Sequence, residues 1–349
     1  MDSPAVQGAS LPIIELSKLR DGDPATNSSL LAACQEVGFF YLDLRSSYSQ
    51  AILQQVEDLI RTTQKVFDLP VEEKSKYVTE NYGDSKIHGY RGLGLSTGPV
   101  EGKKDGFESY MISEMGLFGL DEGSMPFAGP EPIQSAKPVL TKFIGSLHET
   151  ALVILSSLYK SLAMEDILPF EDCHRQNRSS ATGLGLLRYL PLDCNEERVG
   201  HIAHTDAGSL SMVFSHVAGL QVLMPDDTWE FAIPRPGHTI VNVGDTLTFL
   251  SKGKLRSSLH RVVPHPDAVT RTKYTVVYLL RPELTTKFRD SEGKEWTAIG
   301  WHNRKFNLFR HAPAAEMLES STLTGRKHYI GYWEPPADIN TKGSSLVKT

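Results

Sequence analysis

The sequence predicts a protein of the α+β class that is mainly β in its core: a jelly roll, or double-stranded β-helix, with an N-terminal helical support region. Two observations lead to this prediction. Apolar residues recur at helical spacing in the first half of the chain, whereas short β-branched or alternating runs separated by turns follow after Ser180. No linker-like stretch separates the halves, which favours one packed unit over the alternative of two unrelated domains.

The first half alternates short strands with helices. Apolar positions at helical spacing mark two long helices, and Pro70 stands near the first turn of a short one. In chain order we expect a strand at residues 11–16, a helix at 28–37, a strand at 39–42, helices at 47–67 and from Pro70, a long loop at 83–106 and a helix at about 133–162. Loops of that length in compact domains are often functional.

The second half is expected to consist of short strands with turns between them. The expected strands are residues 183–189, 203–214, 219–224, 239–243, 246–250, 258–263 and 274–280. This spacing is typical of a sandwich or barrel rather than of a parallel sheet. We therefore divide the chain into a helix-rich region with short strands (1–175), a jelly-roll core (176–300) and a C-terminal helix and tail (301–349).

The composition argues against several classes of protein. The chain has 349 residues, of which 40% are hydrophobic and 22% charged, and its formal charge is −6. Because no basic stripe is present, we expect no nucleic-acid partner. No apolar run approaches roughly 20 residues, so we expect no membrane partner. The polar N-terminus and three scattered cysteines, Cys34, Cys173 and Cys194, favour a cytoplasmic location.

One group of residues suggests a metal site. His204 and Asp206 stand two positions apart, and in a strand such residues point to the same face. A third ligand must come from another strand, where His260 stands. Two histidines and one carboxylate leave three octahedral positions open, as in non-haem iron(II) oxygenases. The alternative is that these side chains make ordinary hydrogen bonds. We expect His201, three residues before His204, to point to the opposite face.

Motifs in a consistent order extend over nearly the whole chain. They are Leu11-Pro-Ile-Ile-Glu-Leu16, Ala33-Cys-Gln-Glu-Val-Gly-Phe-Phe-Tyr-Leu42, His88-Gly-Tyr90, Lys104-Asp-Gly-Phe-Glu-Ser-Tyr110, His204-Thr-Asp206, Gly219-Leu-Gln-Val222, Val241-Asn-Val-Gly-Asp-Thr-Leu247 and Ser258-Leu-His260-Arg-Val262. In these motifs the chain resembles the 2-oxoglutarate-dependent dioxygenases related to isopenicillin N synthase. Each motif alone is weak, and their shared order makes the resemblance specific.

The resemblance implies Fe(II) held by His204, Asp206 and His260, with 2-oxoglutarate as co-substrate. Family members hold the far carboxylate of 2-oxoglutarate with an Arg-x-Ser pair, and Lys273 and Thr275 stand at the matching positions. Tyr189 matches a family tyrosine that reaches the same carboxylate. Lysine offers a point charge where arginine offers a bidentate fork, so Arg271, two residues earlier, is an alternative anchor.

The implied function is oxidation of a small molecule, expected to be a specialised metabolite, with dioxygen. Hydrogen abstraction would lead to hydroxylation, desaturation or ring rearrangement, with release of succinate and CO2. One alternative is an isopenicillin N synthase-like Fe(II) oxidase that does not use 2-oxoglutarate; another is a non-catalytic small-molecule-binding jelly roll. We expect substrate contacts from residues 83–110 and from Phe306 and Phe309. Arg281 either pairs with a substrate carboxylate or caps a strand end.

Overall fold

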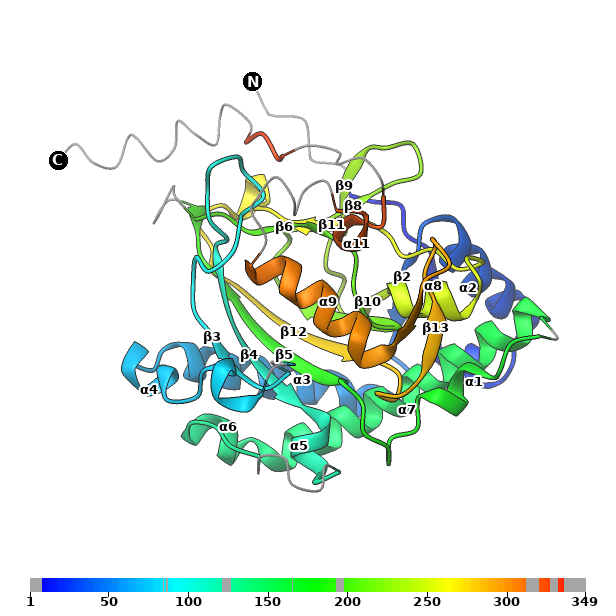
Figure 1. Ribbon diagram of the computed structural model, residues 1–349, viewed down its shortest axis with the longest axis horizontal. Helices are drawn as coiled ribbons and strands as arrows, with labels where there is room; N and C mark the ends of the chain where they lie inside the picture. Colours follow the sequence, from blue (N-terminus) through cyan, green and yellow to red (C-terminus); the bar gives the residue numbers. More distant parts are fainter. Residues whose placement is uncertain are drawn as a thin grey trace.

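Two β-sheets dominate the computed structural model, which describes residues 8–83, 85, 87–120, 127–164, 166–192, 198–311, 320–326 and 332–335. Cys194 and the end of the predicted C-terminal tail, residues 336–349, lie outside the described residues. The sheets face each other, and helices cover the outer face of the larger one (Figure 1). The predicted jelly-roll core with a helical support region is thereby confirmed.

The larger sheet has eight strands, in the order β1, β2, β10, β7, β12, β5, β4 and β3. All neighbours pair antiparallel except β1 and β2, which are parallel. The strands are β1 (Ile13–Glu15), β2 (Phe39–Asp43), β3 (Gly89–Arg91), β4 (Phe107–Ser113), β5 (Gly183–Tyr189), β7 (Leu210–Ser215), β10 (His238–Val243) and β12 (Lys273–Leu280). Strands from both halves of the chain therefore share one sheet.

The smaller sheet has four antiparallel strands in the order β6, β11, β8 and β9. They are β6 (His201–His204), β11 (His260–Val262), β8 (Leu220–Leu223) and β9 (Trp229–Phe231). A separate hairpin pairs β13 (Lys287–Arg289) with β14 (Glu295–Thr297).

The long helices α3 and α7 pack against the outer face of the larger sheet, whereas α9 lies between the two sheets in the view of Figure 1. The helices are α1 (Leu16–Arg20), α2 (Pro24–Glu36), α3 (Gln50–Phe67), α4 (Val71–Ser75), α5 (Glu114–Phe118), α6 (Glu131–Ser135), α7 (Lys137–Leu162), α8 (Asp245–Leu250), α9 (Ala298–His311) and α11 (Ser321–Thr324).

Strand β12 shows how the sequence pattern positions the site. Successive side chains of a strand point to opposite faces. Val276, Tyr278 and Leu280 are buried in the main core, which the sheet shares with α3 and α7. The alternate residues, Lys273, Thr275, Val277 and Leu279, line a cavity on the inner face. One strand thus contributes both to the core and to a row of cavity-lining groups.

Some sequence predictions of local structure are wrong. The expected strand at residues 246–250 belongs to the helix α8, because Gly244 begins a helical turn and Thr246 bonds back to the loop carbonyl of Ala207. The expected single strand at 203–214 is two strands in different sheets, with a turn between them. The loop at 83–106 contains the short strand β3, and the helix at 133–162 is divided into α6 and α7.

Helix α7 also corrects the expectation that no segment can cross a membrane. By length and composition alone its 26 residues meet that requirement. Half of its most apolar stretch is buried inside the protein, and Phe143, Leu147 and Ile154 belong to the main core. A core helix meets the same two criteria, and we interpret α7 as one.

Candidate active site

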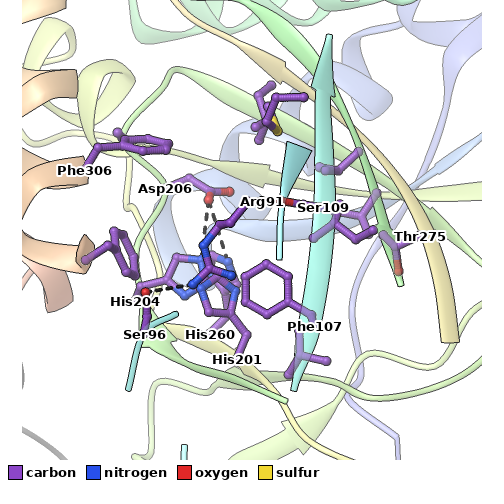
Figure 2. Close-up of a pocket in the computed structure, with 18 of the residues that line it drawn as sticks. Arg91, Ser96, Phe107, Ser109, His201, His204, Asp206, His260, Thr275 and Phe306 are labelled. Carbon is purple, nitrogen blue, oxygen red and sulfur yellow. Dashed lines mark hydrogen bonds and ion pairs between the residues drawn. The ribbon is translucent and has the colours of Figure 1, made fainter. Parts of the chain in front are cut away.

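The side chains of His204, Asp206 and His260 meet at the inner face of the smaller sheet (Figure 2). Their possible ligand atoms all lie within 4.8 Å of one another. The Nε2 atoms of His204 and His260 are each 3.8 Å from Oδ1 of Asp206. His204 and His260 are direct cross-strand partners of β6 and β11. Asp206 stands two residues beyond the end of β6, so a turn rather than a shared strand face brings it to the histidines.

Hydrogen bonds fix which atom of each side chain faces the centre. Nδ1 of His204 donates to the carbonyl of Ile202 (2.8 Å), and Nδ1 of His260 donates to that of Ser258 (3.1 Å). Both Nε2 atoms are thereby left to face the centre. Such outer hydrogen bonds orient metal-binding histidines in proteins and set their tautomer.

Asp206 is oriented in the same way. Its Oδ2 accepts hydrogen bonds from Ser211 Oγ (2.6 Å) and Asn242 Nδ2 (2.8 Å), which leaves Oδ1 toward the two imidazoles. Ser211 comes from β7 and Asn242 from β10, so the larger sheet holds the carboxylate that the smaller sheet's histidines surround. Neither residue was expected in this role from the sequence.

The protonation states suit metal binding. Burial lowers the pKa of His204 to about 3, with the nearby His260 acting in the same direction. For Asp206, burial opposes ionisation, but the two histidines and the bonds from Asn242 and Ser211 outweigh it and hold the pKa well below its usual value. A neutral imidazole and an ionised carboxylate are the forms that bind metal. The residues present therefore fit a divalent metal ion with nitrogen and oxygen ligands.

A buried lysine stands further along the same cavity, which has a volume of about 210 Å³. Lys273 Nζ donates to Ser215 Oγ (2.7 Å) and Thr275 Oγ1 (2.9 Å). Tyr189 is the cross-strand partner of Lys273 on β5, and the ammonium lies 5.9 Å from its ring centroid. Burial lowers the pKa of Lys273 to about 7. Among the described residues Lys273 has no ion-pair partner, so an anionic ligand would stabilise its charge.

The alternative anchor, Arg271, lies elsewhere. It precedes the start of β12, its side chain is exposed, and it does not line the main cavity. It borders a small neighbouring cavity that Lys273 and Tyr189 also line. A substitution at Arg271 is therefore a useful control for one at Lys273.

His201 lies in the cavity, contrary to the sequence prediction. Its ring centroid is 4.4 Å from that of His204 and 4.5 Å from that of Phe107. The reason is a register irregularity: His260 pairs with His204, but Val262 pairs with His201, so β6 has one residue more than β11 over this stretch. An extra residue of this kind reverses the side-chain alternation. No pattern in the local sequence signals it.

Three further cations border the cavity. Arg91 forms an ion pair with buried Asp105 and donates to Ser96 Oγ (2.8 Å), as Figure 2 shows for Ser96. Lys305 of α9 forms an ion pair with Asp245 and donates to Thr205 Oγ1 (2.6 Å). Arg281, directly after β12, completes the set. Phe306 and Phe309 of α9 also line the cavity.

A cluster of two histidines and one carboxylate inside a jelly roll defines a class: the non-haem iron(II) oxygenases. Residues 171–282 match the family model of the 2OG-Fe(II) oxygenase superfamily. Residues 11–116 match the model described as non-haem dioxygenase in morphine synthesis N-terminal. The chain belongs to the 2-oxoglutarate- and Fe(II)-dependent oxygenase superfamily.

Individual relatives agree with this assignment. The chain is 35% identical over 321 residues to the 2-oxoglutarate-dependent dioxygenase FG08081 of Gibberella zeae, a match that covers 92% of this chain and 93% of the relative. It is 33% identical over 323 residues to the 2-oxoglutarate-dependent dioxygenase frbH of a Dothideomycetidae species, covering 92% and 97%.

The fold is similar to the crystal structure of a full-length Neurospora crassa protein in complex with alpha-KG. The TM-score is 0.70 at 23% identity, and the match covers 87% of this chain and 98% of that one. Together with the site, the comparisons show an Fe(II)- and 2-oxoglutarate-dependent dioxygenase that acts on a small molecule with dioxygen. They do not favour the oxidase or the non-catalytic alternative.

Proposed function

We propose that His204, Asp206 and His260 hold the Fe(II), and that Lys273, Thr275 and Tyr189 hold the far carboxylate of 2-oxoglutarate. The observation that carries this proposal is the buried ammonium of Lys273. It has hydroxyl partners but no counter-ion among the described residues, and it shares a cavity with the histidine–aspartate cluster. A dicarboxylate that reaches the metal with one end would present its other carboxylate to Lys273.

When bound, the iron with 2-oxoglutarate and dioxygen supplies an oxidant strong enough to remove a hydrogen atom from the substrate. The residues of the chain position the reactants and keep water away. Ser211 and Asn242 hold the Asp206 carboxylate in one orientation. Phe107, Phe306 and other apolar side chains surround the cluster (Figure 2), which limits the access of water to the reaction.

For the substrate, we propose a specialised metabolite with a largely apolar body that is hydroxylated, desaturated or rearranged. The cavity lining supports this, because Met111, Val213, Val277, Leu279 and Phe309 present hydrocarbon or aromatic surface. We also propose that the enzyme works in the cytoplasm, without a nucleic-acid or membrane partner. The formal charge of −6 and the mixed distribution of charges along the chain support the absence of a nucleic-acid partner.

The test is an anaerobic titration. Protein with Fe(II) and 2-oxoglutarate should show a weak visible charge-transfer band, and turnover after dioxygen is admitted should release succinate. His204→Ala, Asp206→Ala and His260→Ala should each abolish the band and the turnover, with near-normal folding. His216→Ala is a matched control, because His216 is exposed and pairs with Glu57 at the surface. A triad variant that keeps near-wild-type activity would show that the ligand assignment is wrong.

A further inference from the structure

Arg281 is a buried cation with an unsatisfied edge. Its residue is only 6% exposed, and it lines the main cavity. Nη1 donates to the carbonyl of Ala181 (2.5 Å). Nε is sealed from solvent and has no hydrogen-bond partner, and the described residues provide none for Nη2. Leaving a buried charged donor unpaired is costly in free energy. The backbone bond alone therefore does not account for this side chain as a strand-end cap.

The position of Arg281 places it beside the metal cluster. Its Cγ lies against Gly208, where an added Cβ would come within 3.0 Å of it. Gly208 follows Asp206 by two residues, in the turn that leads into β7. The guanidinium carbon lies 5.8 Å from the ring centroid of Phe306, on α9. Arg281 therefore stands where the metal-side turn and α9 meet.

Arg281 and Lys273 do not serve the same carboxylate. Eight residues separate them along the chain, and a strand rises roughly 3.3 Å per residue, which places their Cα atoms about 26 Å apart at full extension. Lys273 stands at the start of β12 and Arg281 directly after its end. With Lys273 assigned to 2-oxoglutarate, Arg281 is left to another group.

The ion pairs that the described residues form around the cavity also leave the charge of Arg281 unbalanced. Arg91 and Lys305 each have a carboxylate partner, Asp105 and Asp245 respectively. Arg281 has no ion pair among the described residues, although Asp206 influences it through space. The charge of Asp206 is committed to the metal. A second anion in the cavity would therefore be stabilised by Arg281.

We propose that Arg281 binds a carboxylate of the organic substrate and so selects monoanionic substrates. This inference rests on the proposed function, because it assigns 2-oxoglutarate to Lys273. The geometry favours a carboxylate, since Nε and Nη2 form the edge of a guanidinium that a planar carboxylate binds with two parallel hydrogen bonds. Because Nε is sealed from solvent in this structure, binding through that edge requires the side chain to rotate toward the cavity. One guanidinium matches one negative charge, whereas a phosphate dianion would keep an unmatched one.

The other residues that line the cavity indicate the chemical character of the rest of the substrate. Met111, Val277, Leu279 and Phe306 lie in the same cavity as Arg281. A molecule that places its carboxylate on Arg281 thus extends an apolar body toward the metal cluster. The proposed substrate class is an apolar or aromatic carboxylic acid.

The experiment measures binding rather than turnover. Wild-type protein with Fe(II) and saturating 2-oxoglutarate is titrated anaerobically, by calorimetry, with 3-phenylpropanoate, octanoate and 4-tert-butylbenzoate. Each acid is compared with its amide and with the matching phosphonate. The variants are Arg281→Gln, Arg281→Lys and the control Arg175→Gln, which removes a nearby surface ion pair with Glu283. Saturating 2-oxoglutarate keeps the acids from Lys273.

At least one acid should bind the wild type and Arg175→Gln more tightly than its amide. Arg281→Gln should weaken acid binding about 10- to 100-fold and leave amide binding unchanged, because a charged hydrogen-bonded pair is lost. Its affinity for 2-oxoglutarate should not change. Should Arg281→Gln not fold, Arg281→Lys replaces it, and it should keep part of the acid preference because it keeps the charge.

Three results would overturn the inference: no acid preferred over its amide, a preference that survives in Arg281→Gln, or tighter binding of the phosphonates. Loss of 2-oxoglutarate affinity in Arg281→Gln would also overturn it, since Arg281 would then be the co-substrate anchor. Failure of the proposed function is visible separately, as a wild-type protein that gives no charge-transfer band with Fe(II) and 2-oxoglutarate.

Discussion

Lys273 should make the affinity for 2-oxoglutarate depend on pH. Burial lowers the pKa of its ammonium to about 7, and a carboxylate bound beside it would raise that pKa again. Only the charged form pairs with the carboxylate. Affinity is therefore full below pH 7 and falls as the pH rises through 7, until the higher pKa of the complex is reached. Because the fall is about tenfold per pH unit, the dissociation constant at about pH 8.5 should be about 30 times that at pH 6.

Two substitutions at this position separate charge from shape. In Lys273→Arg the guanidinium stays charged throughout this range, so the slope with pH should disappear. In Lys273→Ala the carboxylate loses its buried partner, which costs about 3–5 kcal/mol, or a 100- to 1000-fold loss of affinity or more. Any 2-oxoglutarate binding that remains in Lys273→Ala should also lack the pH dependence that Lys273 causes, because alanine does not titrate. Arg271→Ala, exposed and outside the cavity, should behave as the wild type.

The assay is an anaerobic 2-oxoglutarate titration with saturating Fe(II), followed by the visible band and by calorimetry. The metal ligands are the same residues in all variants, so the difference between wild type and Lys273→Arg isolates residue 273. Equal slopes in those two proteins would refute the reasoning. If Arg271→Ala weakens binding and Lys273→Ala does not, the anchor has been placed on the wrong residue. If Lys273→Arg does not bind 2-oxoglutarate because the guanidinium does not fit, Lys273→Ala is compared with the wild type instead. Equal pH dependence of the 2-oxoglutarate affinity in those two proteins would then refute the reasoning.

Three further predictions concern the surroundings of the site and the core. Asn242→Ala removes a 2.8 Å hydrogen bond to Asp206, so Fe(II) affinity should fall about 10- to 100-fold in an anaerobic metal titration; unchanged affinity would contradict the orienting role. Lys273→Met removes a buried, desolvated cation that destabilises the folded state. This destabilisation is complete below pH 7, where the folded protein holds the charged form, and disappears as the pH rises toward 10.5. The substitution should raise the free energy of unfolding at pH 7 by at most about 5 kcal/mol while 2-oxoglutarate binding is lost, as measured by denaturant unfolding. Burial raises the pKa of Glu114 to about 7, so the folded protein keeps this carboxyl neutral while the unfolded chain ionises it above about pH 4.5. Stability should then fall by about 3 kcal/mol between pH 4.5 and 7, and Glu114→Gln, compared by unfolding at pH 5 and pH 8, should lack this fall.

The sequence predicted which residue types form the centre better than how the chain brings them together. His204, Asp206 and His260 do lie together, but not because His204 and Asp206 share a strand face. Strand β6 ends at His204, and a turn whose backbone bonds to β12 and α8 carries Asp206. Short motifs report residue types at fixed spacing, and a turn can deliver the same spacing as a strand.

Other errors have one physical origin: contacts between distant parts of the chain override local pattern. The alternation rule placed His201 outside the cavity, and the extra residue in β6 relative to β11 returns it to the inside. The sequence of residues 246–250 predicts a strand, yet it forms most of the helix α8. Asp245 of this helix forms a buried ion pair with Lys305. Neither the bulge nor that ion pair leaves a signal in the local sequence.

Strand β12, whose bounds the sequence predicted to within one residue, also explains why its functions are separable. In β12 every second side chain lines the cavity, so one element presents Lys273 and Thr275 at its start and Leu279 near its end, with Arg281 directly after it. A shift of register by one residue would exchange these groups for Val276, Tyr278 and Leu280, which are buried in the main core. The register is therefore fixed by the core, and the length of the strand separates Lys273 from Arg281, neither of which has an ion-pair partner among the described residues. Because of this separation, a substitution at one end should change the affinity for one carboxylate without changing the other.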